Sequence, residues 1–121
     1  MPEIFLVMRK PGNIRVLCQA LEGHGYTCTG ISDKKALEAR FEQPLSPDLA
    51  LVDVSGFGES VWSMCELLQH KDVPFIVLSA KQELGLSSQT LRYGAASILE
   101  KPIVKTSLLK LIENMAHASA R

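Results

Sequence analysis

Short apolar runs recur along the chain and alternate with segments of a longer hydrophobic period. Three runs are continuous, at residues 3–8, 48–53 and 74–78, and turn-forming or charged residues bound each of them. Continuous runs of this length suit strands that a parallel sheet buries on both faces. Two weaker candidates lie at residues 26–31 and 96–100, and the alternation of the first favours an edge strand. The pattern therefore predicts five strands.

Between the strands, the apolar positions follow the helical period. Residues 14–21 and 61–68 each place four apolar side chains at the spacing i, i+3, i+4 and i+7, which gives a helix one apolar face. Gly23 and Gly25 follow the first of these segments and are expected to end its helix. The two apolar faces predict helices that pack on the sheet.

Three further helices are expected. One covers residues 36–41 with Ser32 or Asp33 as its N-cap, and the last begins near Thr106. Residues 83–92 are expected to form a short fourth helix. Strands that alternate with helices imply right-handed crossovers and a parallel sheet covered on both faces. The predicted fold class is therefore α/β.

Length and composition indicate a single domain over residues 1–121. A chain of 121 residues with 46% hydrophobic residues can build one core of ordinary size, and it shows no internal repeat or linker. Its 13 basic and 13 acidic residues balance, which leaves no electrostatic footprint for DNA, RNA or an anionic membrane. We therefore expect no nucleic-acid partner and no membrane partner.

The apolar run near the N-terminus and the cysteines indicate the cellular compartment of the protein. The apolar run at residues 4–8 is too short to span a membrane and has neither the basic leader nor the cleavage site of an export signal. The three cysteines, Cys18, Cys28 and Cys65, match neither a disulfide framework nor a zinc spacing. Each is expected to be a small buried apolar residue. We expect a cytoplasmic protein.

Candidate chemistry gathers in the loops after the predicted strands. Arg9 and Lys10 follow the first strand, Asp53 closes the third, Ser79 follows the fourth and Lys101 follows the fifth. In an open parallel sheet, the loops at the carboxyl ends of the strands form the binding edge. A carboxylate, a hydroxyl and three cations are therefore expected to converge on one edge.

The order and spacing of these residues resemble the receiver domain of a response regulator. The matching positions end the third strand, follow the fourth, and flank the fifth, at Asp53, Ser79-Ala80, Gly94-Ala95 and Lys101-Pro102. The similarity spans nearly the whole chain. It implies a CheY-like, flavodoxin-like three-layer sandwich, with a five-stranded parallel sheet of order 2-1-3-4-5 and helices on both faces.

The resemblance also implies a role for each residue of the pocket. By position, Asp53 is the aspartate that accepts a phosphoryl group from a histidine kinase. Ser79 corresponds to the hydroxyl that hydrogen-bonds a phosphoryl oxygen, and Lys101 to the cation that pairs with the aspartate and then with the phosphoryl group. Ser55 and Ala80 belong to the same phosphoryl and switch pocket.

Three positions depart from the family pattern. Arg9 and Lys10 stand where the family places the acidic pair that holds Mg²⁺, so two anions have become two cations. Magnesium is a hard cation that prefers carboxylate oxygens, so we expect weak or no Mg²⁺ binding and no other cofactor. Arg9 is expected instead to form a salt bridge with Asp53. Ile98 replaces the aromatic residue that often changes rotamer on activation.

We interpret the chain as a signal-transduction regulatory domain, an atypical receiver or pseudo-receiver of a two-component phosphorelay, and not as an enzyme. It is expected to act by protein–protein contact with a histidine kinase, a phosphotransfer protein or an output domain. One alternative is a working phospho-receiver in which Arg9 or Lys10 replaces Mg²⁺ beside the phosphoryl group. Another is a flavodoxin-like enzyme that binds a nucleotide, flavin or anion, but no glycine-rich phosphate loop supports it.

Simpler interpretations of the same residues stay open. Asp53 could be no more than a member of a structural ion pair, and Arg9 and Lys10 could be solvated loop cations. These two cations and the helix start at residues 12–13 could also bind an external anion. A homodimer could form through the fourth helix, fifth strand and fifth helix, a face that includes the charged residues Arg92, Glu100, Lys105 and Lys110.

Overall fold

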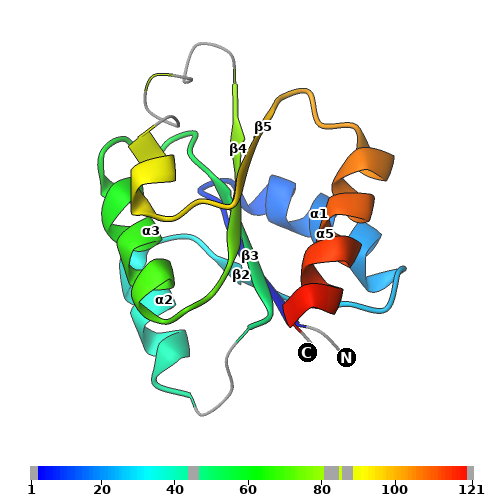
Figure 1. The fold of residues 1–121 in the computed structure, drawn as a ribbon, viewed down its shortest axis with the longest axis horizontal. Coiled ribbons are helices and arrows are strands. Elements are labelled where there is room, and N and C mark those ends of the chain that lie inside the picture. Colours follow the sequence, from blue (N-terminus) through cyan, green and yellow to red (C-terminus); the bar gives the residue numbers. More distant parts are fainter. Residues whose placement is uncertain (1–2, 44–46, 81–84, 86–88, 120–121) are drawn as a thin grey trace.

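A five-stranded parallel sheet forms the middle layer of the computed structural model (Figure 1). The strands are β1 (Glu3–Val7), β2 (Thr27–Ile31), β3 (Leu49–Asp53), β4 (Phe75–Ser79) and β5 (Ser97–Glu100). They lie in the order β2-β1-β3-β4-β5, and every neighbouring pair is parallel. Each predicted strand is confirmed to within one residue at either end. The order is the one that the resemblance implies.

Helices cover both faces of this sheet. The structure describes residues 3–43, 47–80, 85 and 89–119, with side chains as far as residue 115. The elements that join the strands are α1 (Pro11–Glu22), α2 (Lys34–Phe41), α3 (Ser60–His70), the 3-10 turn η2 (Leu91–Tyr93) and α5 (Lys105–Ser119). Figure 1 shows α1 and α5 on one side of the sheet and α2 and α3 on the other. None of these described helices is long and apolar enough to cross a membrane.

The expected short helix over residues 83–92 lies mostly outside the described residues. The part that the structure describes ends in η2, and Gly94 follows it with a positive φ of 97°. That left-handed conformation suits glycine, which has no Cβ. The turn therefore ends at Gly94, and β5 begins three residues later.

The hydrophobic core consists of two clusters, one on each face of the sheet. Along β1, Phe5 and Val7 belong to the cluster beneath α2 and α3, whereas Ile4 and Leu6 belong to the cluster beneath α1 and α5. Strands β1, β3 and β4 are almost completely buried because each has a strand on both sides. β2 and β5 are the two edge strands, which confirms the prediction for residues 26–31.

Helix α1 packs very closely on β2. A Cβ atom placed on Gly30 would lie only 2.7 Å from Cγ2 of Ile14, so this contact requires glycine. At the other end of the helix, the backbone N–H of Tyr26 donates to the carbonyl oxygen of Leu21 at 3.2 Å. The helix itself ends before Gly23, as the sequence predicts. The contact between Ile14 and Gly30 thus brings α1 close to β2.

The N-cap of α2 is Asp33, one of the two residues that the sequence offers for this position. Its carboxylate accepts a hydrogen bond from the backbone N–H of Ala36 at 2.8 Å. The first N–H groups of a helix have no partner within the helix, and such a cap satisfies one of them. The last helix, α5, begins at Lys105, one residue before the expected start at Thr106.

Candidate functional site

The carboxyl ends of β3 and β5 meet in an ion pair between Asp53 and Lys101. The ammonium nitrogen Nζ of Lys101 lies 2.7 Å from Oδ2 and 2.8 Å from Oδ1 of Asp53. The side chain of Asp53 is 6% exposed and that of Lys101 is 28% exposed, so little water reaches the carboxylate. Burying a carboxylate is costly unless a partner replaces its hydration, and Lys101 is this partner.

Ser55 completes the cluster from the loop after β3. Its hydroxyl oxygen Oγ accepts a hydrogen bond from Nζ of Lys101 at 3.0 Å, and its backbone N–H donates to Oδ1 of Asp53 at 3.0 Å. An ammonium group has three N–H donors. Here three oxygen atoms, two from Asp53 and one from Ser55, lie within their reach. The polar groups at the centre of the site therefore satisfy one another.

Strand pairing brings these distant residues together. Asp53 is the last residue of β3, and Lys101 follows β5 at a separation of 48 positions. Strand β4 lies between the two, and the carbonyl oxygen of Ser79 accepts a hydrogen bond from the backbone N–H of Lys101 at 2.8 Å. The N–H of Val54 donates to the carbonyl oxygen of Leu78 at 3.1 Å. The sheet thus holds both ends of the ion pair at one edge.

The Ser79 hydroxyl bonds outside this cluster. Its side chain is fully buried, and the hydroxyl donates to the backbone oxygen of Ala80 at 3.0 Å. A hydroxyl has one proton to donate, so Ser79 donates none to Asp53 in this structure. The fold therefore brings Asp53, Lys101 and Ser55 into contact. It places Ser79 and Ala80 on the neighbouring strand end without joining their side chains to the ion pair.

Arg9 and Lys10 are exposed in the turn before α1. The stem of Arg9 lies over Gly56, where an added Cβ atom would be 3.1 Å from Cγ and 3.2 Å from Cβ of Arg9. The expected salt bridge between Arg9 and Asp53 is not formed among the described residues, because the ion pair of Asp53 is with Lys101. Both carboxylate oxygens are already bound, and Arg9 keeps its hydration at the surface. Lys10 is the N-cap of α1 and makes no capping bond with its side chain.

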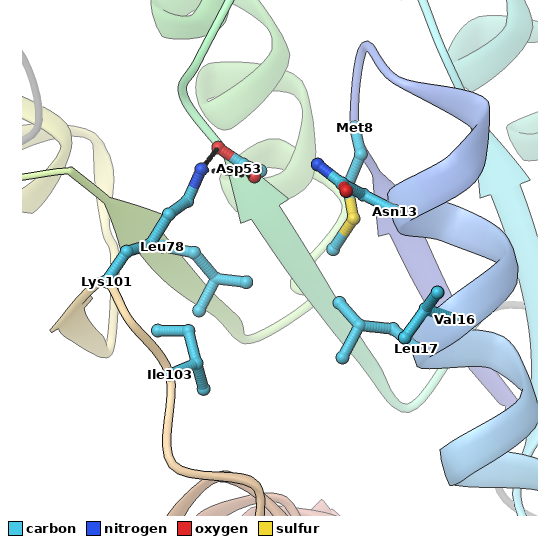
Figure 2. A pocket seen from close by; sticks show the side chains of 8 residues that line it. All are labelled: Met8, Asn13, Val16, Leu17, Asp53, Leu78, Lys101 and Ile103. Atoms are coloured by element: carbon cyan, nitrogen blue, oxygen red, sulfur yellow. Dashed lines mark hydrogen bonds and ion pairs between the residues drawn. The ribbon is translucent and has the colours of Figure 1, made fainter.

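Met8 belongs to the site although no sequence motif marks it. A cavity of about 230 Å³ opens beside the ion pair (Figure 2). Most of its lining residues are apolar, and the full set is Met8, Asn13, Val16, Leu17, Asp53, Leu78, Lys101 and Ile103. Figure 2 shows Met8 and Asn13 across the cavity from Leu78 and Lys101. The alternation along β1 could have found Met8, because it belongs to the same cluster as Ile4 and Leu6.

The residues of this site do not fit Mg²⁺. Hard cations of this kind require several carboxylate or carbonyl oxygens in near-octahedral geometry. Over the described part of the chain, no three His, Cys, Asp or Glu side chains are grouped so that they could hold a metal ion. Beside Asp53, the cavity presents the thioether of Met8 and the ammonium group of Lys101. A soft sulfur atom and a cation are both poor neighbours for Mg²⁺.

Ile98 is half-buried on β5 and packs against the apolar cluster beneath α2 and α3. Tyr93 packs against the same cluster and stacks on Trp62 of α3, with ring centroids 6.3 Å apart and an interplanar angle of 18°. Ile98 has neither a ring nor a hydroxyl, so a change of its rotamer exposes no polar group. Tyr93, which precedes β5 in the chain, is held against α3 by this stacking.

The fold and this site define a class of protein. A five-stranded parallel sheet of order β2-β1-β3-β4-β5 with helices on both faces is the CheY-like flavodoxin fold, and here an Asp–Lys pair lies at its carboxyl edge. The family model of the response regulator receiver domain matches residues 4–113. The chain therefore belongs to this family and is the receiver domain of a two-component response regulator.

Solved receiver structures share the fold at low sequence identity. A response regulator receiver protein from Burkholderia phymatum is 20% identical, with a TM-score of 0.84 over 97% of this chain and 96% of that chain. A response regulator receiver domain protein from Clostridium thermocellum is 18% identical, with a TM-score of 0.86 over 99% and 98%. Full-length FixJ from B. japonicum is 18% identical, with a TM-score of 0.84 over 98% and 59%. Comparison with curated proteins finds no match.

Proposed function

We propose that this chain is an atypical receiver that acts by protein–protein contact, with little or no Mg²⁺-dependent phosphorylation of Asp53. The chemistry beside Asp53 carries this proposal, because the cavity presents the thioether of Met8 and the ammonium group of Lys101 where Mg²⁺ would need further oxygen ligands. Lys101 balances the charge of Asp53 without a metal ion. The domain then needs no cofactor and is a binding module, not an enzyme.

The charge requirements of phosphoryl transfer support the same conclusion. The transferring group spreads negative charge over its oxygens, and metal ions neutralise that charge in the known phosphotransfer enzymes. At this site the residues beside Asp53 do not fit Mg²⁺, and Met8 contributes only an apolar thioether. Transfer to Asp53 would therefore lack its electrostatic clamp and proceed slowly.

A metal-independent phospho-receiver is the second candidate, and one observation favours it. The stem of Arg9 is held against Gly56, three residues after Asp53, so its guanidinium group is tethered close to the site. An aspartyl phosphate carries a charge of about −2. Arg9 and Lys101 could neutralise this charge together without a metal ion. The two candidate functions therefore differ in whether Asp53 accepts a phosphoryl group.

The partner in the proposed contact is another protein domain. A histidine kinase, a phosphotransfer protein and an output domain are the three kinds of partner that suit a receiver. The matched region covers 59% of full-length FixJ, so this fold is one part of that longer chain. The balanced charge of 13 basic and 13 acidic residues supports a protein partner in the cytoplasm over nucleic acid or a membrane.

Acetyl phosphate provides the test. The purified protein is incubated with this donor, with and without Mg²⁺, and its intact mass is measured beside an Asp53→Ala control. We expect no phosphoryl adduct under either condition. An adduct on the wild type alone would overturn the proposal. Labelling without a metal ion would support the role of Arg9, and labelling only with Mg²⁺ would show an ordinary receiver.

The position of Met8 leads to a prediction about restoring a metal site. Met8→Asp combined with Arg9→Asp places two carboxylates at the end of β1, one of them lining the cavity beside Asp53. We expect this variant to bind Mg²⁺, as measured by titration of its tryptophan fluorescence, because hard oxygen ligands replace sulfur. Arg9→Asp combined with Lys10→Asp is the matched control and should bind more weakly, since Lys10 is exposed at the helix cap. Equal binding by both variants would contradict this assignment of Met8.

A further inference from the structure

Two of the three cysteines lie at the contact between α1 and β2. Cys18 is on α1 and Cys28 is on β2, and both are half-buried free thiols that pack against the cluster beneath α1 and α5. Ile14 of the helix lies directly over Gly30 of the strand. Cys18 comes one helical turn after Ile14, so the two lie on the same face of α1. Cys28 comes two residues before Gly30, so these two lie on the same face of β2.

The turn that joins α1 to β2 agrees with this arrangement. The backbone N–H of Tyr26 donates to the carbonyl oxygen of Leu21 at 3.2 Å. Cys18 and Cys28 both lie between this hydrogen bond and the contact of Ile14. The helix therefore runs antiparallel to the strand, and the facing sides of the two elements carry one thiol each. Their register places Cys18 opposite Cys28.

The electrostatics of Cys28 agree with this placement. Burial raises the pKa of its thiol most, and the neighbouring Cys18 thiol and the carboxylates of Glu22 and Glu3 raise it further, to about 12. One thiol influences another in this way only at short range. Because the thiolate is the reactive form of a cysteine, the raised pKa makes Cys28 react slowly at neutral pH and faster as the pH rises.

We propose that Cys18 and Cys28 form a reversible intramolecular disulfide when the protein meets a peroxide. With hydrogen peroxide, two S–H bonds and the O–O bond break and one S–S bond forms. The two electrons and two protons pass to the peroxide, which leaves as two molecules of water. The cross-link joins α1 to the edge strand β2. Leu17, next to Cys18, lines the cavity beside Asp53, so the cross-link also holds that wall in place.

Counting free thiols tests this proposal. The reduced protein is oxidised in its folded state with hydrogen peroxide at mildly alkaline pH, then unfolded and treated with N-ethylmaleimide. We expect uptake to fall from three adducts to one, which corresponds to Cys65 alone. Peptide mapping should find Cys18 linked to Cys28, and dithiothreitol should restore all three adducts. The oxidised protein should also unfold several degrees higher, because a cross-link restricts the unfolded chain.

Variants separate the specific pair from general oxidation. Cys65→Ala is the matched control, and its uptake should fall from two adducts to none. Cys18→Ser should retain both remaining thiols after the same treatment. Uptake that stays at three in the wild type, or a cross-link that includes Cys65, would overturn the proposal. Peptide mapping of the wild type decides between these outcomes even where a variant fails to fold.

Discussion

At the scale of single residues, Asp53 shows how its neighbours decide what a carboxylate can do. The residue is 4% exposed, and its two oxygens contact the ammonium group of Lys101 and the backbone N–H of Ser55. A buried charge left without a partner costs several kcal/mol, whereas a paired one can be nearly neutral to stability. The ion pair with Lys101 therefore offsets the cost of burying an aspartate at the end of β3.

A double-mutant cycle measures this dependence. Lys101→Met removes the ammonium group and keeps most of the side-chain volume, and Asp53→Asn removes the charge and keeps the shape. We expect Lys101→Met to lower the free energy of unfolding by about 2 kcal/mol, because it leaves a buried carboxylate unpaired. In the double variant, denaturant unfolding should show a coupling of about 1 kcal/mol or more. Strictly additive losses would show that the pair adds no net stability.

The buried thiol of Cys65 makes the free energy of unfolding depend on pH. Burial raises the pKa of its thiol from the ordinary 9.0 to about 12. Because the folded protein favours the neutral thiol, Cys65 contributes fully to stability at a pH below the pKa that the thiol has in the unfolded chain. This contribution is lost as the pH rises from 9.0 toward about 12. One such thiol gives a slope of at most about 1.4 kcal/mol per pH unit.

The variant Cys65→Ala removes this ionisation. We expect it to be less stable near neutral pH, because it opens a small cavity in the core. Its stability should nevertheless decline less steeply than that of the wild type above pH 9.0. Urea unfolding across the alkaline range measures both effects. If the two proteins lost stability in parallel there, the assigned role of the buried thiol would be wrong.

The sequence predicted the members of the site better than their contacts. Asp53 and Lys101 follow apolar strands, and strand ends of a parallel sheet share one edge, so their proximity was predictable. The bond from Ser79 to Ala80 was not, because a hydroxyl rotates toward whichever acceptor its surroundings offer. Met8 was missed because a methionine at the end of an apolar run carries no polar signal.

At the scale of secondary-structure elements, burial decided what could be predicted. Strands β1, β3 and β4 are buried on both faces and form continuous apolar runs in the sequence, so their limits were clear. The cap of α2 was ambiguous because Ser32 and Asp33 are both good N-cap residues. The close packing at Gly30 could not be predicted, since a strand glycine alone does not reveal which helix lies over it.

Gly30→Ala tests how tightly α1 packs on β2. The added Cβ would lie 2.7 Å from Cγ2 of Ile14, so the helix must shift, and we expect a loss of about 1–3 kcal/mol. Ile14→Ala in the same chain removes the clash and should make the pair of changes less costly than their sum. Gly12→Ala, whose added Cβ meets nothing within 4 Å, is the control. Equal thermal stability of the Gly30 and Gly12 variants would contradict the close contact.

At the scale of the whole molecule, one face is suited to self-association. Strand β5 is an edge strand, and Leu91 (54% exposed) and Val104 (62% exposed) precede and follow it in the chain. The charged residues predicted for this face are also exposed: Arg92, Glu100, Lys105 and Lys110. Exposed apolar side chains among charges of both signs favour a self-complementary contact.

We therefore predict a concentration-dependent homodimer through this face. Sedimentation velocity should show the dimer increasing as the protein concentration rises. Glu100→Lys should weaken it by removing the one acidic residue in the predicted set of four, whereas Glu38→Lys on α2 should have no effect. A protein that stays monomeric at the highest concentration would contradict the prediction.

The family was predictable from the sequence, but the state of the site was not. Five strands that alternate with helical segments, together with a set of strand-end residues, have an order that few folds share. Whether Asp53 is phosphorylated depends instead on charges within a few ångströms of it. Arg9 illustrates this limit, because the sequence placed it near Asp53 but only the structure shows its stem over Gly56 and its surface exposure.

The ion pair between Asp53 and Lys101 has a consequence for folding kinetics. The two residues are 48 positions apart, and β4 separates their strands. Their side chains cannot meet until β3, β4 and β5 have paired in register, so the entropy of closing that long loop is lost first. We therefore expect the pair to form late, after the main folding barrier. Breaking it should speed unfolding and leave the folding rate almost unchanged, so this contact sets how long the native state lasts rather than how quickly it forms.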